Sequence, residues 1–163
     1  MTSYSNPETD SRLNAYQAAG KISKSRMAQE APLDAAALEA VEASDIVVVT
    51  GCYDHVEQVL GALEVPYTTV DPRHLDNLPL RPEQLLVVNC PGEMSPVAIV
   101  RIRDFVANGG TLFTTDWALR HVVEPAFPGH VAYNGRSTGD DVVRIEVVDA
   151  TSPYLAGVLD AEN

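Results

Sequence analysis

Short runs of apolar, β-branched residues recur in the middle of the chain and predict the strands of a sheet. Ile46–Thr50 and Leu85–Asn89 are almost continuously apolar, which is typical of parallel strands buried on both faces. Tyr67–Val70 and Leu112–Thr115 are shorter runs of the same kind. Gly51, Asp71 and Asp116 directly follow three of these runs, and such residues commonly end strands. We therefore expect four strands.

Helical patterns separate these runs. Apolar residues within Val56–Leu63 recur at i, i+3, i+4 and i+7, and Asp54 and Glu57 have the spacing of a capping box. Ser95-Pro96 is a strong helix start, because serine accepts backbone N–H bonds at the N-cap and proline fits the first turn. Asn108–Gly110 is a typical helix end.

The alternation of strands and helices predicts an α/β fold, a flavodoxin-like three-layer sandwich with a mostly parallel sheet of order 2-1-3-4. Val142–Val148 alternates apolar residues with Arg144 and Glu146, which predicts an additional edge strand with one solvated face. Ligands of such sheets bind at the carboxyl ends of the strands, where the strand order reverses. That point lies between the first and third strands here.

The first part of the chain has a different composition. Residues 1–32 are polar with few large apolar groups, and we expect an N-terminal arm that is disordered or docked on a partner. Asp34–Ala43 is rich in alanine and predicts a helix that lies on the sheet through Leu38 and Val41. Residues 33–163 are expected to form the α/β domain.

Charge and composition exclude several classes of protein. The 163 residues carry a formal net charge of -12, which disfavours nucleic acid and anionic membrane surfaces as partners. The apolar runs are far too short to span a bilayer, and the polar start lacks an apolar signal core, so a cytoplasmic location is expected. No glycine-rich nucleotide motif or zinc spacing is present, so no cofactor is predicted.

Two stretches resemble a known family. The run VVNCPGEMSP, then a helix, then NGGTLFTTDWAL resembles the class I glutamine amidotransferase-like fold, nearest to its non-amidotransferase, ThuA-like branch. Asp149–Leu159 resembles a family segment that begins with His-Pro, although Ser152 here precedes Pro153. The resemblance covers about residues 45–159. It implies further sheet after residue 159, so the domain is expected to be incomplete there or completed by a partner.

The resemblance also implies where a nucleophile would lie. The reactive cysteine of the amidotransferases follows the strand after the third-strand helix, and the matching position holds Asp116 without flanking glycines. The loop Cys90–Glu93 matches the oxyanion-type loop, but only Gly92 resembles its glycines and Pro91 has no N–H to donate. The resemblance therefore does not carry glutaminase chemistry to this chain.

Our leading hypothesis is a catalytically silent domain that acts in protein assembly, including self-association, or in binding a small polar ligand. The polar arm and the predicted edge strand offer assembly surfaces. A small ligand would bind in the crevice at the strand ends. Its candidate residues are Cys52, Asp54, Cys90, Gly92, Glu93, Asp116 and Trp117.

An enzymatic alternative depends on Cys90. This residue ends the third strand near the start of the following helix, whose dipole would lower the pKa of a thiol. With His55 or His121 as base, Cys90 could act in a hydrolase or isomerase on a carbonyl or sugar compound.

A second alternative is a redox or metal-binding module that uses Cys52 and Cys90. The two cysteines follow strands expected to be neighbours, ~4.8 Å apart. Carboxylates at the same edge could hold Mg²⁺. These carboxylates are Asp54, Asp71, Glu93 and Asp116.

Overall fold

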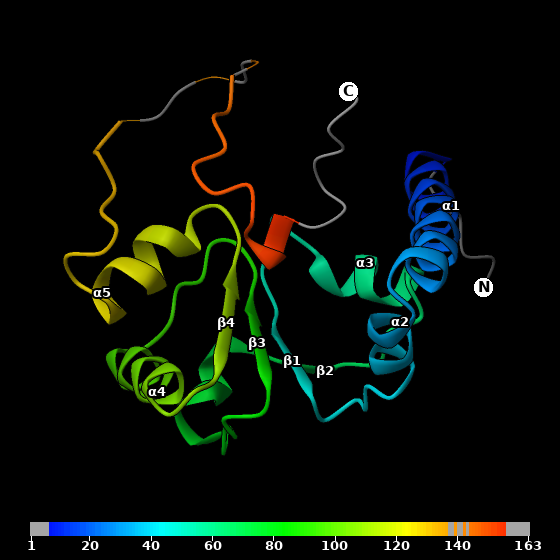
Figure 1. The fold of residues 1–163 in the computed structure, drawn as a ribbon. Coiled ribbons are helices and arrows are strands. Elements are labelled where there is room, and N and C mark those ends of the chain that lie inside the picture. Colours follow the sequence, from blue (N-terminus) through cyan, green and yellow to red (C-terminus); the bar gives the residue numbers. More distant parts are fainter. Residues whose placement is uncertain (1–6, 137–138, 140–141, 143, 156–163) are drawn as a thin grey trace. The chain divides into compact units, whose positions relative to one another are not determined.

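The computed structural model describes residues 7–136, 139, 142 and 144–155 (Figure 1). The chain divides into two compact units, residues 1–133 and 134–163. The second unit holds the short turn η3 (Pro153–Leu155). The elements of the first unit are α1 (Pro7–Glu30), α2 (Pro32–Glu39), β1 (Ile46–Val49), α3 (Val56–Ala62), β2 (Thr68–Val70), η1 (Pro72–Asn77), β3 (Leu85–Val88), α4 (Pro96–Ala107), β4 (Thr111–Thr114), η2 (Leu119–Val123) and α5 (Glu124–Ala126).

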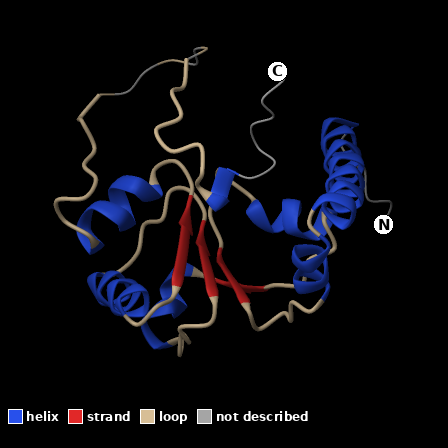
Figure 2. Cartoon of the chain, in the orientation of Figure 1, coloured by secondary structure: helices blue, strands red, loops and turns tan. Residues whose placement is uncertain are grey.

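The first unit is built on a four-stranded parallel sheet of order β2-β1-β3-β4, labelled in Figure 1 and drawn in red in Figure 2. Ile46 of β1 pairs with Leu85 of β3, and Leu85 pairs with Thr111 of β4. This order is the one predicted, and it reverses between β1 and β3. The carboxyl ends of β1, β3 and β4 therefore meet at one edge of the sheet.

Apolar residues cover both faces of the central strands β1 and β3, whereas Phe113 of β4 is half exposed. One face packs against α4, η1 and η2, with Val49, Val88 and Ile102 fully buried in its core. The other face packs against α2 and α3, and the predicted contacts of Leu38 and Val41 are present there. The structure thus confirms the α/β, flavodoxin-like three-layer arrangement.

Local signals set the bounds of α4 as predicted. The Ser95 hydroxyl accepts a hydrogen bond from the Ala98 N–H at 3.0 Å, and Pro96 occupies the first turn. At the other end Asn108 caps the helix, and Gly109 follows with a φ of 101°, a conformation that favours glycine.

The predicted capping box of α3 is wrong. His55, not Asp54, occupies the N-cap and makes no capping bond. The Val56 N–H instead donates to the Asn89 side-chain oxygen at 3.3 Å, and Glu57 accepts from the Asn89 amide at 2.7 Å. A fully buried side chain at the end of β3 therefore caps this helix.

The stretch predicted as an arm is helical over its described residues. It forms α1, which contacts α2 and α3 of its own chain. Gly20 is buried at this contact, where an added Cβ would lie 3.0 Å from the Ala62 carbonyl oxygen. Lys24 and Glu64 form an exposed ion pair at 3.4 Å, which contributes little to stability.

The structure also differs from the prediction at Val142–Val148. The described residues of this span, 142 and 144–148, form no strand, and Val142 and Val148 are almost fully exposed. Alternation of apolar and polar residues alone therefore does not determine a strand, whose stability also depends on cross-strand side-chain contacts. The described sheet ends at β4, and assembly through that edge stays a prediction. None of the described helices is long and apolar enough to cross a bilayer.

Candidate functional site

A cavity lies at the carboxyl ends of the strands, where the sheet order predicts a ligand site. Its volume is about 390 Å³. Its described lining comes from the loops that follow β1, β3 and β4, and from η2. The lining residues are Tyr53, Cys90, Pro91, Glu93, Asp116, Trp117 and His121.

The Cys90 thiol is buried in the wall of this cavity. Its side chain is 1% exposed, and its Sγ donates a hydrogen bond to Asp116 Oδ2 at 3.5 Å. Burial raises the pKa of the thiol; a hydrogen bond from the Trp117 backbone N–H opposes this, and the carboxylates of Asp116 and Asp54 raise the pKa further. The thiol is therefore protonated at neutral pH, contrary to the lowering expected from the start of α4.

Asp116 occupies a sharp turn between β4 and η2. Its φ of 40° is uncommon for a residue with a side chain, although aspartate tolerates it better than most. Hydrogen bonds from Ala118 N to Thr115 O and from Leu119 N to Asp116 O close the turn, at 3.0 and 3.1 Å. The Thr115 hydroxyl accepts from the Cys90 N–H at 3.0 Å, which joins the turn to the end of β3.

His121 adds an imidazole ring to the cavity wall. Its Nδ1 lies 2.8 Å from the Pro91 carbonyl oxygen. Because a carbonyl oxygen only accepts, Nδ1 carries the proton in this contact. In the neutral ring, Nε2 then has the free lone pair.

An aromatic cluster adjoins the cavity. Trp117 stacks on His121 with ring centroids 6.1 Å apart, and Tyr133 tilts against Trp117 at 5.2 Å. The Arg120 guanidinium lies over both rings, 5.8 Å from the centroid of Trp117 and 5.1 Å from that of Tyr133. These distances are those of cation–π contacts.

Of the predicted site residues, four line the cavity: Cys90, Glu93, Asp116 and Trp117. Gly92 is buried beside η2 instead. It has a φ of 72°, and an added Cβ would lie 2.9 Å from the Ala118 Cβ. The geometry therefore explains this glycine by backbone conformation and packing.

Cys52 and Cys90 do not form a disulfide bond. Both are free; Cys52 is exposed, and its backbone N–H donates to the Cys90 carbonyl oxygen at 3.1 Å. The Cys90 thiol is instead bonded to Asp116, from the loop after β4. His55 bonds through Nδ1 to Glu57 at 3.0 Å and is not among the described residues that line the cavity.

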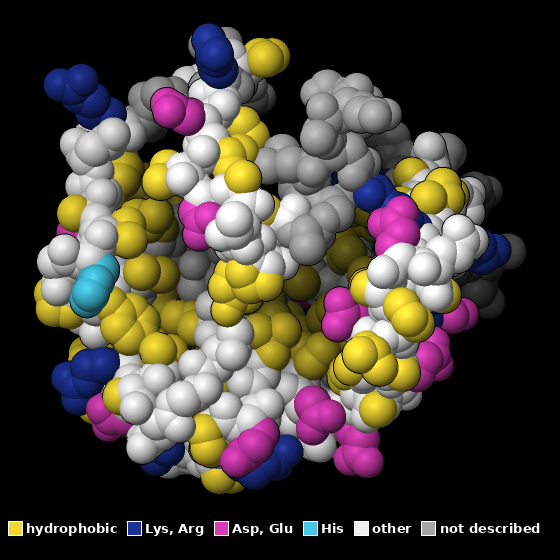
Figure 3. Space-filling model, in the orientation of Figure 1, with side chains coloured by type: hydrophobic (Ala, Val, Ile, Leu, Met, Phe, Trp, Pro, Cys, Tyr) yellow, Lys and Arg dark blue, Asp and Glu magenta, His cyan; other side chains and the backbone are white. Residues whose placement is uncertain are grey.

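The acidic residues do not converge on one point. Asp71 is bonded to Arg73, whose guanidinium holds the pKa of that carboxyl well below its usual range. Among the described residues, no group of three or more His, Cys, Asp or Glu side chains could hold a metal ion. On the face drawn in Figure 3, carboxylates (magenta) are scattered rather than gathered in one patch.

Three residues of the site were not in the predicted set of ligand-binding residues. Tyr53 and Pro91 line the cavity because they lie in the loops that follow β1 and β3, and this position was the available signal. His121 was considered only as a base for Cys90. Its contact with Pro91 joins residues 30 positions apart, which no local pattern predicts.

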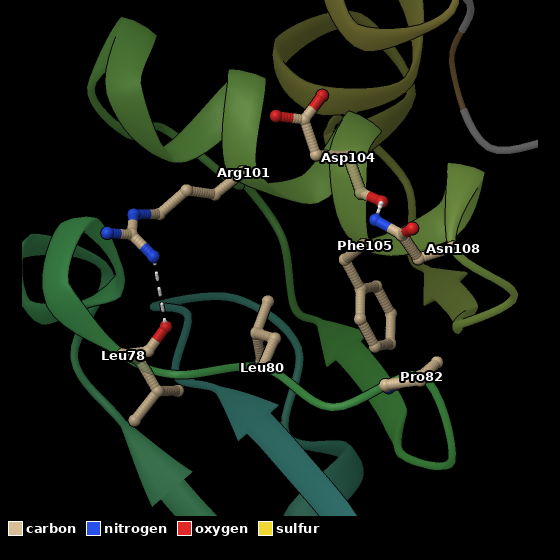
Figure 4. Close-up of a pocket in the computed structure, with 7 residues that line it drawn as sticks. All are labelled: Leu78, Leu80, Pro82, Arg101, Asp104, Phe105 and Asn108. Atoms are coloured by element: carbon tan, nitrogen blue, oxygen red, sulfur yellow. Dashed lines mark hydrogen bonds between the residues drawn. The ribbon is translucent and has the colours of Figure 1, made fainter.

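A larger hollow of about 640 Å³ lies at the amino end of β3, beside α4 (Figure 4). Its polar groups are engaged within the chain: Arg101 donates to the Leu78 carbonyl at 3.4 Å, and the Asn108 amide donates to the Asp104 carbonyl at 2.7 Å. This hollow lies away from the carboxyl ends of the strands. The strand-end cavity therefore remains the candidate site.

Comparisons of the chain with protein-family models, with curated proteins and with solved structures give no match. The amidotransferase resemblance accordingly stays a prediction.

Proposed function

We propose that this chain is a catalytically silent, amidotransferase-like domain that binds a small polar ligand in the strand-end cavity. The observation that carries the proposal is the hydrogen bond from the Cys90 thiol to Asp116. A cysteine nucleophile attacks as its thiolate. A buried thiol that donates to a carboxylate resists ionisation, which argues against a Cys90-dependent enzyme.

The turn at Asp116 supports the same proposal. A strained strand-to-helix turn is the geometry that presents the nucleophile in elbow-type hydrolases. Here such a turn presents a carboxylate, at the position that the resemblance assigns to the amidotransferase cysteine. A concave site with an aromatic side chain and a few convergent polar groups is suited to binding a small molecule.

The rate of alkylation tests whether the Cys90 thiol is unreactive. In a Cys52→Ala variant, Cys90 should react with iodoacetamide at pH 7 roughly tenfold or more slowly than free cysteine, because the thiolate is scarce and buried. Mass spectrometry of the modified protein gives the rate. Cys90→Ala is the matched control, in which the exposed Cys52 should react at about the rate of free cysteine. A Cys90 that reacts faster than free cysteine would favour the enzyme alternative.

A further inference from the structure

We infer that the ligand of the strand-end cavity is a small organic cation that carries N–H donors, such as a primary ammonium compound. This inference rests on the proposed function and specifies its ligand class. It follows from the hydrogen-bonding character, the charge and the aromatic content of the cavity wall.

The charged side chains of the wall offer acceptors, whereas Tyr53 and Trp117 add one O–H and one N–H group. Glu93 and Asp116 present carboxylates, which only accept when ionised. One oxygen of Asp116 accepts from the Cys90 thiol, and its other oxygen has no donor among the hydrogen bonds described for it. In its neutral form His121 adds the lone pair of Nε2, because Nδ1 donates to the Pro91 carbonyl. A complementary ligand therefore supplies donors.

The charged side chains that line the cavity directly have one sign, and the Arg120 guanidinium lies outside this lining, over Trp117. The described residues that line the cavity include two carboxylates and no lysine or arginine. An anion would be repelled there, whereas a cation would gain charge-assisted hydrogen bonds.

The aromatic side chains favour an organic cation over a bare metal ion. Tyr53 and Trp117 line the cavity, and aromatic faces attract ammonium and guanidinium groups. The chain already shows this contact, since Arg120 lies over the rings of Trp117 and Tyr133. A metal site would instead need several ligating groups together, and the described residues hold no such group of three.

Fluorescence can test this ligand class at the site itself, because Trp117 is the sole tryptophan of the chain. We would titrate the full chain with butylammonium chloride, butyramide and sodium butyrate at constant ionic strength. Butylammonium should give a saturable change, and the neutral and anionic probes should bind at least roughly tenfold more weakly, the effect of losing one charged hydrogen bond.

Two variants locate the binding. Asp116→Asn and Glu93→Gln should each weaken butylammonium binding roughly tenfold, because each keeps the shape of the side chain and removes its charge. Asp34→Asn is the matched control: Asp34 is exposed in the first turn of α2, and its variant should bind like wild type. Thermal melting shows whether each variant is folded.

The contradicting results are separable from failure of the proposed function. Butyrate or butyramide binding as tightly as butylammonium would overturn the cationic ligand class but leave a binding cavity. No saturable response to any probe, or undiminished binding in both folded site variants, would also overturn the inference. Failure of the proposed function would instead appear as rapid alkylation of Cys90.

Discussion

Replacing Gly51 with alanine is expected to lower the free energy of unfolding by about 3 kcal/mol or more. An added Cβ would lie 2.1 Å from the Cys90 carbonyl oxygen and 2.8 Å from the Asn89 Cβ. Neither group can move aside easily, since both residues are buried at the end of β3. The variant must therefore separate the loops that follow β1 and β3.

The close approach of the loops that follow β1 and β3 also positions residues of the strand-end cavity. The N–H groups of Cys52 and Tyr53 both point to the Cys90 carbonyl oxygen, at 3.1 and 3.5 Å. Separating the two loops should therefore disturb the cavity as well as the stability of the sheet.

Denaturant unfolding measures the effect, with Gly61→Ala as the matched control. Gly61 lies in α3, and an added Cβ would meet only the Tyr67 hydroxyl, 3.8 Å away. That substitution should stabilise the protein by about 0.5–1 kcal/mol, because alanine has the higher helix propensity. If Gly51→Ala unfolded at the same denaturant concentration as wild type, the described approach of the two loops would be wrong.

The second large effect is expected for Asn89→Asp, which should cost about 3 kcal/mol at pH 7. The Asn89 amide is fully buried and donates to Glu57 at 2.7 Å. The substitution replaces this donor with a second carboxyl at nearly the same position. Two carboxylates in contact repel each other, and burial adds a desolvation cost to the new charge.

This cost should depend on pH in a defined direction. Burial and the Glu57 carboxylate would raise the pKa of the introduced carboxyl in the folded state. The folded variant would then keep a proton that the unfolded chain loses above about pH 4, so its stability falls relative to wild type as the pH rises. The difference between variant and wild type should be small at pH 4 and large at pH 7.

Asn77→Asp is the control for charge alone. Asn77 is exposed at the end of η1, and the same substitution there should change stability by less than about 0.5 kcal/mol. Equal effects at the two positions, or a cost at position 89 that does not vary with pH, would contradict the described contact of Asn89 with Glu57.

Much of the fold was predictable because its signals are local. Ser95-Pro96 and Asn108–Gly110 mark the ends of α4 within a few residues, and the apolar runs mark the strands. The cap of α3 was not predictable in this way, because Asn89 lies 33 positions from Val56. The alternation of Val142–Val148 was a local signal too, but a strand depends on a neighbouring strand as well.

The site was predictable in position and less so in chemistry. Strand order alone brought the ends of β1 and β3 together, and Cys90, Glu93 and Asp116 follow from it. The pKa of Cys90 was expected to fall because of the nearby helix start. In the folded chain the pKa of Cys90 is raised instead, because burial and the Asp116 carboxylate, 26 positions away, outweigh the effect of the helix start. The direction of such a pKa shift depends on contacts that only the folded chain makes.

The most direct measurement of the central claim is the infrared S–H stretching band of Cys90 in the Cys52→Ala protein. We predict that the band is present at pH 7 and moves to higher frequency when Asp116→Ala removes its hydrogen-bond acceptor. Absence of the band at pH 7 in the folded protein would mean a thiolate at the strand end, and would contradict a silent site.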